Sequence, residues 1–486
     1  MKKLIALMLV AVMAISMFAA CNNSTTTTKA PETTKAPETT KAPETTKAPE
    51  TTKAPETTEA PELNTDWIWE DKTMSGEITF AIPFKGNQGM DAMIAEFNES
   101  YPNIKVNLHT YSNSSDGNIA TNTAMINGII DVIASFGLAN TYKRWENNLL
   151  MDLTDMVEEE GIDLVANWGT DVYKYEDSIY SFPCGGMSYY VAINMTAWNA
   201  AGLGELPTEW TWDEYLEASK KMTEYDEKGN VAIYGGSDSQ STNYFMYTLC
   251  QLTGGDMYYD EDGTSSYDNP RVLASLEREL KAELEDKIWF PKAVYRADGY
   301  GSNEALCNNY ANSVITNNVI RFLHNKESFP NVNWITGFAP YPVENKGETN
   351  YMAGVSTFSH AGIAENSQNK EAAWTFLKWY STYGVKYLAV AGHQPKWAGT
   401  EAGSAINLIY GSEEEAAKWV DIDSFNYVVG RTDLPGFVET NLTALSEVSA
   451  ALSGPIMDAI NGEITAEECL KRAQEDADKA IANAQD

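Results

Sequence analysis

The stretch that decides the fold class reads GEITFAIPFKGNQGMDAMIAEFNESYPNIKVNLHT and occupies residues 76–110. Apolar residues alternate with polar or small ones over residues 78–82 and again over 104–108, which is typical of strands. The segment between them, residues 89–100, has a helical pattern. A strand, a helix and a second strand in this order predict one unit of an α/β domain, with two parallel strands joined by a helical crossover.

The chain beyond this unit continues the same alternation. Residues 131–134 form a short apolar run that fits a buried third strand, and residues 373–380 carry apolar side chains along one helix face. Capping boxes, in which Thr caps a helix and Glu reaches back to it, occur at Thr211–Glu214 and Thr465–Glu468. Alternation over about 400 residues predicts an α/β fold of parallel-type sheets flanked by helices.

The charge balance narrows the range of partners. The chain has 34 Lys and Arg against 69 Asp and Glu, a formal net charge of −35. Because nucleic-acid binding needs clustered cations, this balance argues against a nucleic-acid partner and, more weakly, against strongly anionic ligands. The apolar fraction of 43% is enough for a large core. All 13 Trp and 26 Tyr lie after residue 65, which favours a binding surface rich in rings, although many of these rings must be core.

The N-terminus has the pattern of an export signal. Lys2 and Lys3 precede an apolar stretch at residues 4–18, which is too short for a membrane span of roughly 20 residues. The sequence that ends in Ala20 and Cys21 resembles a bacterial lipobox. The resemblance implies that residues 1–20 are a lipoprotein signal peptide, cleaved before Cys21, and that Cys21 carries the lipid. The alternative is an ordinary secretory signal cut after Ala20.

The composition of residues 21–65 predicts a lipid-anchored, disordered Thr/Pro tether. The hexapeptide Lys-Ala-Pro-Glu-Thr-Thr repeats five times between Lys29 and Thr58, and the segment contains no aromatic residue. Such a composition cannot bury enough apolar surface to offset the entropy of ordering. Regular proline favours extended chain, so the tether can reach on the order of 130 Å at about 3.1 Å per residue. This length suits a Gram-positive-type envelope.

The residues that could carry catalysis or hold a metal form no known motif. The four His are widely spaced, and the sequence has no Walker A loop, no dinucleotide fingerprint and no nucleophile elbow. We therefore expect no cofactor and no metal. The cysteines after Cys21 fit neither a zinc nor a redox pattern, so disulfides and buried free thiols both stay open; they are Cys184, Cys250, Cys307 and Cys469.

Five blocks of sequence resemble one family in their order along the chain. They are Tyr101–Val106, Gly128–Ile133, Ser181–Pro183 with Tyr189–Asn194, Ala201–Leu203 with Pro207 and Thr211–Glu214, and Asn366–Lys378. From about Gly76 to the end, the chain is similar to the extracellular solute-binding proteins of ABC transporters, family 1, the oligosaccharide-type group. The chain departs from the family pattern at Cys184–Gly186 and Thr316–Asn318, so the identity of the ligand is not carried over from any one member.

The resemblance implies a two-lobe, periplasmic-binding-protein-like fold with the ligand in the cleft between the lobes. Lobe one would comprise residues 70–187 plus 333–384. Lobe two would comprise residues 188–332 plus 385–486. The chain would cross between the lobes at the boundaries of these ranges.

Strand ends, crossovers and the family's ligand-facing loops nominate the substrate-binding residues. They are Phe84, Lys85, Ser135, Phe136, Met187, Ser188, Tyr189, Asn243, Tyr244, Asn317, Asn318, Gly354, Val355, Ser356 and Arg431. For each aromatic residue among them, core packing is the alternative, and Lys85 is equally well a solvated charge at the rim. By contrast, Trp212, Trp374 and Trp379 are expected to be core, because they lie on helices with apolar partners.

The function implied by the resemblance is the capture of a solute without any chemical change to it. A sugar or oligosaccharide would close the lobes around itself and be delivered to ABC permease subunits by a monomeric, non-enzymatic protein. The lipid on Cys21 would hold this protein at the extracellular face of the cell membrane. The alternatives are a surface glycoside hydrolase, which needs two carboxylates about 5–10 Å apart, and a non-enzymatic glycan-binding adhesin.

Overall fold

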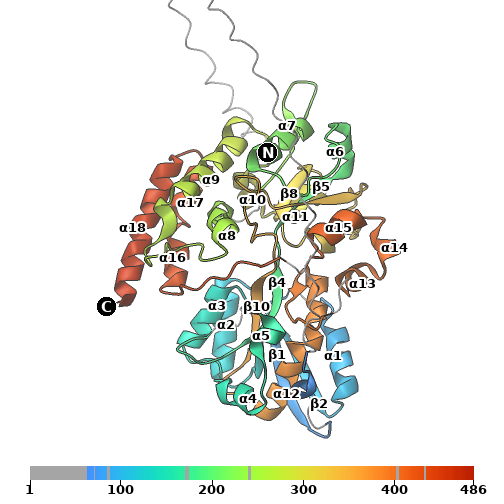
Figure 1. Ribbon diagram of the computed structural model, residues 1–486, viewed down its shortest axis with the longest axis vertical. Helices are drawn as coiled ribbons and strands as arrows, with labels where there is room; N and C mark the ends of the chain where they lie inside the picture. The colour runs from blue at the N-terminus through green and yellow to red at the C-terminus, as the bar shows by residue number, and fades with distance from the viewer. Residues whose placement is uncertain are drawn as a thin grey trace, which may run out of the picture. The chain divides into compact units, whose positions relative to one another are not determined.

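A computed structural model describes residues 63–69, 72–84, 88–169, 174–238, 242–400, 404–431 and 434–485 (Figure 1). The chain divides into two units, residues 1–61 and 62–486, and the second is described here. The predicted signal peptide, Cys21 and almost all of the tether lie outside the described residues, and so does Lys85. Within the described part, no helix has the length and apolar character needed to cross a membrane.

A six-stranded sheet is built around the predicted strand, helix and strand. Its strand order is β11-β4-β10-β3-β1-β2. The bounds are β1 Gly76–Ile82, β2 Ile104–Thr110, β3 Val132–Phe136, β4 Phe182–Met187, β10 Ser356–Ile363 and β11 Gln394–Pro395. β1 is parallel to β2 and to β3, whereas β10 is antiparallel to β3 and β4, and β11 is antiparallel to β4.

The helices of this region lie against the six-stranded sheet (Figure 1). They are α1 Met90–Ser100, α2 Ser115–Ile126, α3 Leu138–Glu146, α4 Thr154–Glu159, α5 Leu164–Trp168 and α12 Lys370–Tyr380, with the short helices η1 Asp66–Ile68 and η6 Tyr383–Ala391. Phe80 of β1 packs on Phe376 and Tyr380 of α12, with ring centroids 5.1 and 4.7 Å apart. The core positions expected for Trp374 and Trp379 are confirmed, because both side chains are buried.

A second, three-stranded sheet has β5 Tyr190–Asn194 in its centre. Its neighbours β8 Ser313–Thr316 and β9 Thr336–Pro340 are both antiparallel to β5. The α/β fold with helices flanking the sheets is confirmed, but the sheets are mixed or antiparallel rather than largely parallel. Strands that come from later parts of the chain enter each sheet in the opposite direction: β10 runs antiparallel to β3 and β4, and β8 and β9 run antiparallel to β5.

Helices surround the three-stranded sheet and make up most of the C-terminal part. Those before β8 are α6 Met195–Ala200, α7 Trp212–Met222, η2 Tyr244–Met246, α8 Tyr247–Thr253, η3 Ser266–Asp268, α9 Pro270–Leu280, the π-helical turn η4 Lys281–Glu285, α10 Lys292–Asp298 and α11 Ser302–Cys307. Those after β8 are η5 Val319–Arg321, α13 Ser404–Tyr410, α14 Glu413–Ala416, α15 Ile422–Val428, α16 Leu445–Ala451, α17 Pro455–Ile460 and α18 Ala466–Gln485. A hairpin of β6 Glu224–Tyr225 and β7 Val231–Ile233 follows α7. The predicted capping box of Thr211 and Glu214 is present at α7.

The pairing of two strands differs from what the predicted lobe boundaries imply. β9 lies within residues 333–384, yet it pairs with β5 in the three-stranded sheet. β11 lies within residues 385–486, yet it pairs with β4 in the six-stranded sheet. The chain therefore passes from one sheet to the other after β4, between β9 and β10, and again near β11.

Candidate functional site

The carboxyl ends of β1 and β3 bring two nominated rings together. Phe84 follows β1 and Phe136 ends β3, and because these strands are parallel neighbours the two rings meet edge to face, 5.5 Å apart. Phe358 of β10 and His393 complete what we call the phenyl group, at 5.4 and 4.7 Å from Phe136. Burial, assisted by Arg321, lowers the pKa of His393 to about 3, so its imidazole is neutral.

The first crossover carries four more nominated residues, which we call the crossover group: Met187, Ser188, Asn317 and Ser356. Met187 and Ser356 face each other across β4 and β10. The Asn317 amide donates to the Met187 sulfur at 2.9 Å, which links β4 to the segment after β8. Ser188 accepts a 2.8 Å hydrogen bond from Gln394. Residues from both sheets thus meet where the chain crosses between them.

Three tyrosines from the three-stranded-sheet region form a tyrosine group beside this crossover. Tyr189, Tyr244 and Tyr247 have ring centroids 5.1–5.5 Å apart, and the hydroxyls of Tyr189 and Tyr247 lie 3.2 Å from each other. The Asn243 amide donates to the Tyr258 hydroxyl at 2.7 Å. The sequence analysis missed Tyr247 and Tyr258; the i, i+3 spacing of Tyr244 and Tyr247 at a helix start is the signal that could have found the former.

The nominated loop Gly354–Ser356 lies against a C-terminal segment that the sequence analysis also missed. The Ser356 hydroxyl accepts from the backbone N–H of Phe437 at 2.9 Å, and Val355 forms a β-bridge with Pro435. A Cβ on Gly354 would lie 2.0 Å from the carbonyl oxygen of Pro435, so only glycine allows this approach. The loop therefore holds residues 435–437 at the site.

The other nominated residues have separate positions. The Ser135 hydroxyl accepts from the Arg144 guanidinium at 2.6 Å, and the Asn318 carbonyl oxygen accepts from the Asn303 amide at 2.9 Å. Arg431 lies over the ring of Tyr427, at 5.2 Å, and lines a pocket of about 270 Å³ that no other nominated residue lines.

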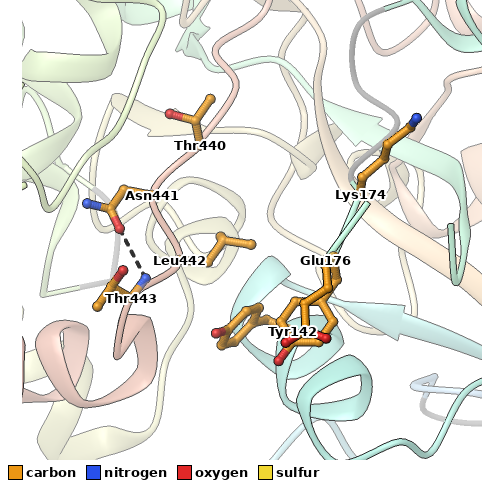
Figure 2. Close-up of a pocket in the computed structure, with 8 residues that line it drawn as sticks. Tyr142, Lys174, Glu176, Thr440, Asn441, Leu442 and Thr443 are labelled. Carbon is orange, nitrogen blue, oxygen red and sulfur yellow. Dashed lines mark hydrogen bonds between the residues drawn. The ribbon is translucent and has the colours of Figure 1, made fainter. Parts of the chain in front are cut away.

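A larger cavity, which we call the open pocket, has a volume of about 440 Å³. It is lined by Tyr142 of α3, by the segment Lys174–Glu176, and by Thr440, Asn441, Leu442 and Thr443 of the C-terminal segment (Figure 2). No nominated residue lines it. The rings of Tyr142 and Tyr175 meet edge to face at 5.6 Å.

Local backbone geometry shapes both walls of the open pocket. Tyr175 and Ser178 exchange backbone hydrogen bonds of 3.0 Å around a tight turn, in which Glu176 and Asp177 both have positive φ, 48° and 67°. On the opposite wall, the Asp256 carboxylate accepts from the backbone N–H groups of Thr440 and Asn441, at 2.5 and 2.9 Å. These contacts fix the two walls independently of each other.

The polar chemistry around these groups consists mainly of neutral hydrogen-bonding side chains beside aromatic rings. Rings, amides and hydroxyls predominate, and among the described residues no group of His, Cys, Asp and Glu is arranged to hold a metal ion. The question of disulfides is settled for the four described cysteines, all of which are buried free thiols. Burial raises the pKa of each of these thiols, so they stay protonated.

Comparisons with known proteins identify the family and the fold. The family model described as bacterial extracellular solute-binding protein matches residues 83–387. An ABC substrate-binding protein of Listeria monocytogenes, solved with cycloalternan, has a TM-score of 0.66 at 20% identity and covers 84% of this chain and 100% of its own. No curated protein matches significantly.

Two further solved structures are similar. The GacH receptor of Streptomyces glaucescens, solved unliganded and with acarbose, has a TM-score of 0.63 at 16% identity, covering 84% of this chain and 99% of its own. A maltose-bound protein of T. maritima has a TM-score of 0.61 at 18% identity, covering 82% of this chain and 98% of its own. At these identities the likeness shows the fold.

Proposed function

The chain belongs to the bacterial extracellular solute-binding proteins, the non-enzymatic binding components of ABC importers, and we propose that its solute is a sugar or oligosaccharide. The observation that carries this proposal is the meeting of flat rings with amides and hydroxyls where the chain crosses between the two sheets. A sugar offers C–H faces to rings and hydroxyls to bidentate polar groups. The family assignment sets aside the glycoside hydrolase and the adhesin as alternatives.

The ligands of similar proteins support the same solute class. The titles of the solved structures name cycloalternan, maltose and acarbose as ligands of those proteins. In this chain the phenyl group, the crossover group and the tyrosine group offer the corresponding chemistry. We extend the site to Tyr247, Tyr258 and Phe437. The Tyr247 ring packs on Tyr189, and the Tyr258 hydroxyl accepts from Asn243. The backbone N–H of Phe437 donates to Ser356.

We further propose that capture works by closure of two lobes. Lobe one would be the six-stranded sheet with its helices, including β11, and lobe two the three-stranded sheet with its helices, including β9. A contact between the two regions is the hydrogen bond from Arg321 of η5 to the Gln88 side chain before α1, at 3.1 Å. Because a sugar would touch both lobes only when they are closed, it would shift the population toward the closed form.

The proposal includes the membrane anchor and the permease. The lipobox-like sequence before Cys21 supports lipid attachment there, and the Thr/Pro repeats support a long tether. A tethered, monomeric protein at the extracellular face of a Gram-positive-type membrane would deliver its solute to ABC permease subunits.

Intrinsic tryptophan fluorescence with a panel of oligosaccharides tests this function. We expect a saturable response to at least one saccharide, and small-angle scattering is expected to give a smaller radius of gyration with that saccharide bound. Saturation by an amino acid or a metal ion, with none by any saccharide, would contradict the proposal.

A matched pair of variants tests the site. Asn317→Ala removes an amide from the crossover group and is expected to weaken saccharide binding by about tenfold or more. Asn461→Ala, at an exposed position after α17, is the control and is expected to bind like the unchanged protein. Equal affinity in both variants would remove Asn317 from the site.

A further inference from the structure

The walls of the open pocket come from both sheet regions. Tyr142 lies on α3, against the six-stranded sheet, and Tyr175 lies in the segment that leads to β4. On the other wall, residues 440–443 lead into α16, one of the helices of the three-stranded-sheet region. A ligand in this pocket would therefore touch both of the proposed lobes.

The C-terminal wall of the open pocket is held by side chains from another part of the chain. The Asp256 carboxylate accepts from the backbone N–H groups of Thr440 and Asn441, at 2.5 and 2.9 Å, and from the Thr440 hydroxyl at 2.8 Å. The Tyr259 hydroxyl donates to the Thr443 carbonyl at 2.6 Å, and the N–H of Thr443 donates to the Asn441 side chain at 3.1 Å (Figure 2). Because these contacts fix this stretch of backbone, a ligand does not have to order it on binding.

The facing wall offers two rings whose hydroxyls are available to a ligand. The side chains of Tyr142 and Tyr175 are half-buried, and their rings meet edge to face at 5.6 Å. Neither hydroxyl forms a hydrogen bond within the described ranges of the chain, and the same is true of the Thr443 hydroxyl on the other wall. The pocket thus combines apolar ring surface with groups that can donate and accept hydrogen bonds, and a saccharide matches this combination.

The charges at the open pocket suit a neutral ligand. Among the described lining residues, the ions are Lys174 and Glu176, which have opposite signs and are both exposed. The Lys174 side chain points away from Tyr142 in Figure 2. A neutral ligand between the rings would therefore leave no charge buried without a partner.

The open pocket is continuous with the tyrosine group. The rings that line it pack against the same apolar cluster that contains Tyr189. The Phe437 ring lies 5.8 Å from that of Tyr247, and Phe437 precedes Thr440 by only three positions. Three residues of extended chain span at most about 11 Å, so one oligosaccharide can touch both the tyrosine group and the open pocket.

We propose that the open pocket binds the end of a linear, neutral oligosaccharide whose other units lie at the tyrosine group. The inference rests on the proposed function and adds selection by chain length. A short saccharide occupies the tyrosine group and leaves the open pocket to water, whereas a longer one also covers the rings of Tyr142 and Tyr175. The pocket volume of about 440 Å³ lies within the range of small-molecule sites, so there is room for this end of the ligand.

Calorimetric titration of the purified protein with two series of probes, maltose to maltohexaose and cellobiose to cellohexaose, tests the inference. In the series that binds, we expect the affinity to rise about tenfold from the disaccharide to the longer members. Tyr142→Ala and Tyr175→Ala are each expected to remove most of this rise and to leave the affinity for the disaccharide within about twofold. Tyr225→Ala, at a side chain on β6 that is 57% exposed, is the control and is expected to keep the rise.

The outcomes separate this inference from the function on which it rests. Equal affinity along a series that binds, a rise that survives both substitutions at the pocket, or an equal loss for the disaccharide and the hexasaccharide would overturn the selection by length and leave sugar capture standing. Saturation by monosaccharides alone would do the same. No response to either series, together with none in the wider saccharide panel, would overturn the proposed function itself.

Discussion

Two groups of acidic residues in this protein differ in whether a buried lysine neutralises them. In the three-stranded-sheet region, the fully buried ammonium of Lys292 is paired with Asp238 at 2.9 Å, with Glu279, and with Glu283 at 3.6 Å. We call these four residues the lysine centre. Around the open pocket, Glu176 and Glu439 have no such buried cation among the described residues. The carboxylates of the lysine centre are thus paired within the fold, whereas Glu176 and the lining cation Lys174 at the open pocket are both exposed.

The protonation of the lysine centre follows from its composition. Three carboxylates surround one ammonium, so they cannot all be ionised in a buried site without cost. Burial raises the pKa of Glu279, and it raises that of Glu283 to about 7. Burial alone would lower the pKa of Lys292, but the carboxylates outweigh it and raise that pKa, so Lys292 stays charged.

Removal of the Lys292 ammonium is expected to have the largest effect on stability of the changes considered for the two groups. Lys292→Met leaves three buried carboxylates without their cation, and we expect it to lower the free energy of unfolding by about 3–5 kcal/mol. Chemical denaturation at neutral pH measures this loss. Adding Glu279→Gln to Lys292→Met is expected to restore part of the stability, because Gln keeps the shape of Glu279 and needs no proton to be neutral.

An exposed lysine provides the control for that experiment. Lys281 pairs with Asp286 at the surface, where their side chains are 59% and 44% exposed. Lys281→Met is expected to leave the denaturation midpoint close to that of the unchanged protein, because a solvent-exposed ion pair adds little to stability. Equal losses in Lys281→Met and Lys292→Met would show that burial does not distinguish the two ion pairs.

Tyr142→Ala tests whether the open pocket serves a ligand rather than the fold. The ring is half-buried and meets Tyr175 at 5.6 Å, so its loss is expected to lower the free energy of unfolding by only about 1 kcal/mol. Ligand affinity is expected to fall about tenfold, or about 1.4 kcal/mol. Titration and denaturation of the same sample give both values. Tyr225→Ala, at a side chain that is 57% exposed, is expected to change neither.

The sequence predicted the parts of this arrangement that depend on local pattern. Alternation at residues 76–110 predicted β1, α1 and β2, and the rule that parallel strands end together brought Phe84 and Phe136 to one edge. The strands of the second sheet gave a weaker signal. β8 is buried at all four positions, so no alternation reveals which strand it pairs with or in which direction.

The parts that the sequence did not predict depend on contacts between distant segments. The backbone N–H groups of Phe437 and Thr440 donate to the side chains of Ser356 and Asp256, which lie 81 and 184 residues away in the chain, and the Thr440 hydroxyl also donates to Asp256. Nothing in the residue types of 434–443 indicates these contacts.

The pH dependence of stability is expected to differ between Glu439→Gln and the unchanged protein. The pKa of Glu439 is raised to about 7 in the folded protein, above its ordinary value, so between about pH 4.5 and pH 7 the folded state holds a proton that the unfolded state has lost. Stability of the unchanged protein therefore falls as the pH rises through this window. The Gln variant lacks this loss, and we expect it to be more stable by about 3 kcal/mol at pH 8 and nearly equal at pH 4.5. The lysine centre titrates in both proteins and cancels from the difference.

The smallest expected effect concerns the turn at the rim of the open pocket. Glu176 and Asp177 adopt left-handed backbone conformations that ordinary residues rarely take, and Asp177→Gly is expected to raise the free energy of unfolding by about 0.5–1 kcal/mol. Glu475→Gly, in the middle of α18, is the matched control and is expected to lower it by about 1 kcal/mol, because a right-handed helix gives glycine no such advantage. Asp177→Gly keeps Glu176 in place, so ligand affinity is expected to stay within about twofold. A larger fall in affinity would show that the conformation of the turn itself contributes to ligand binding.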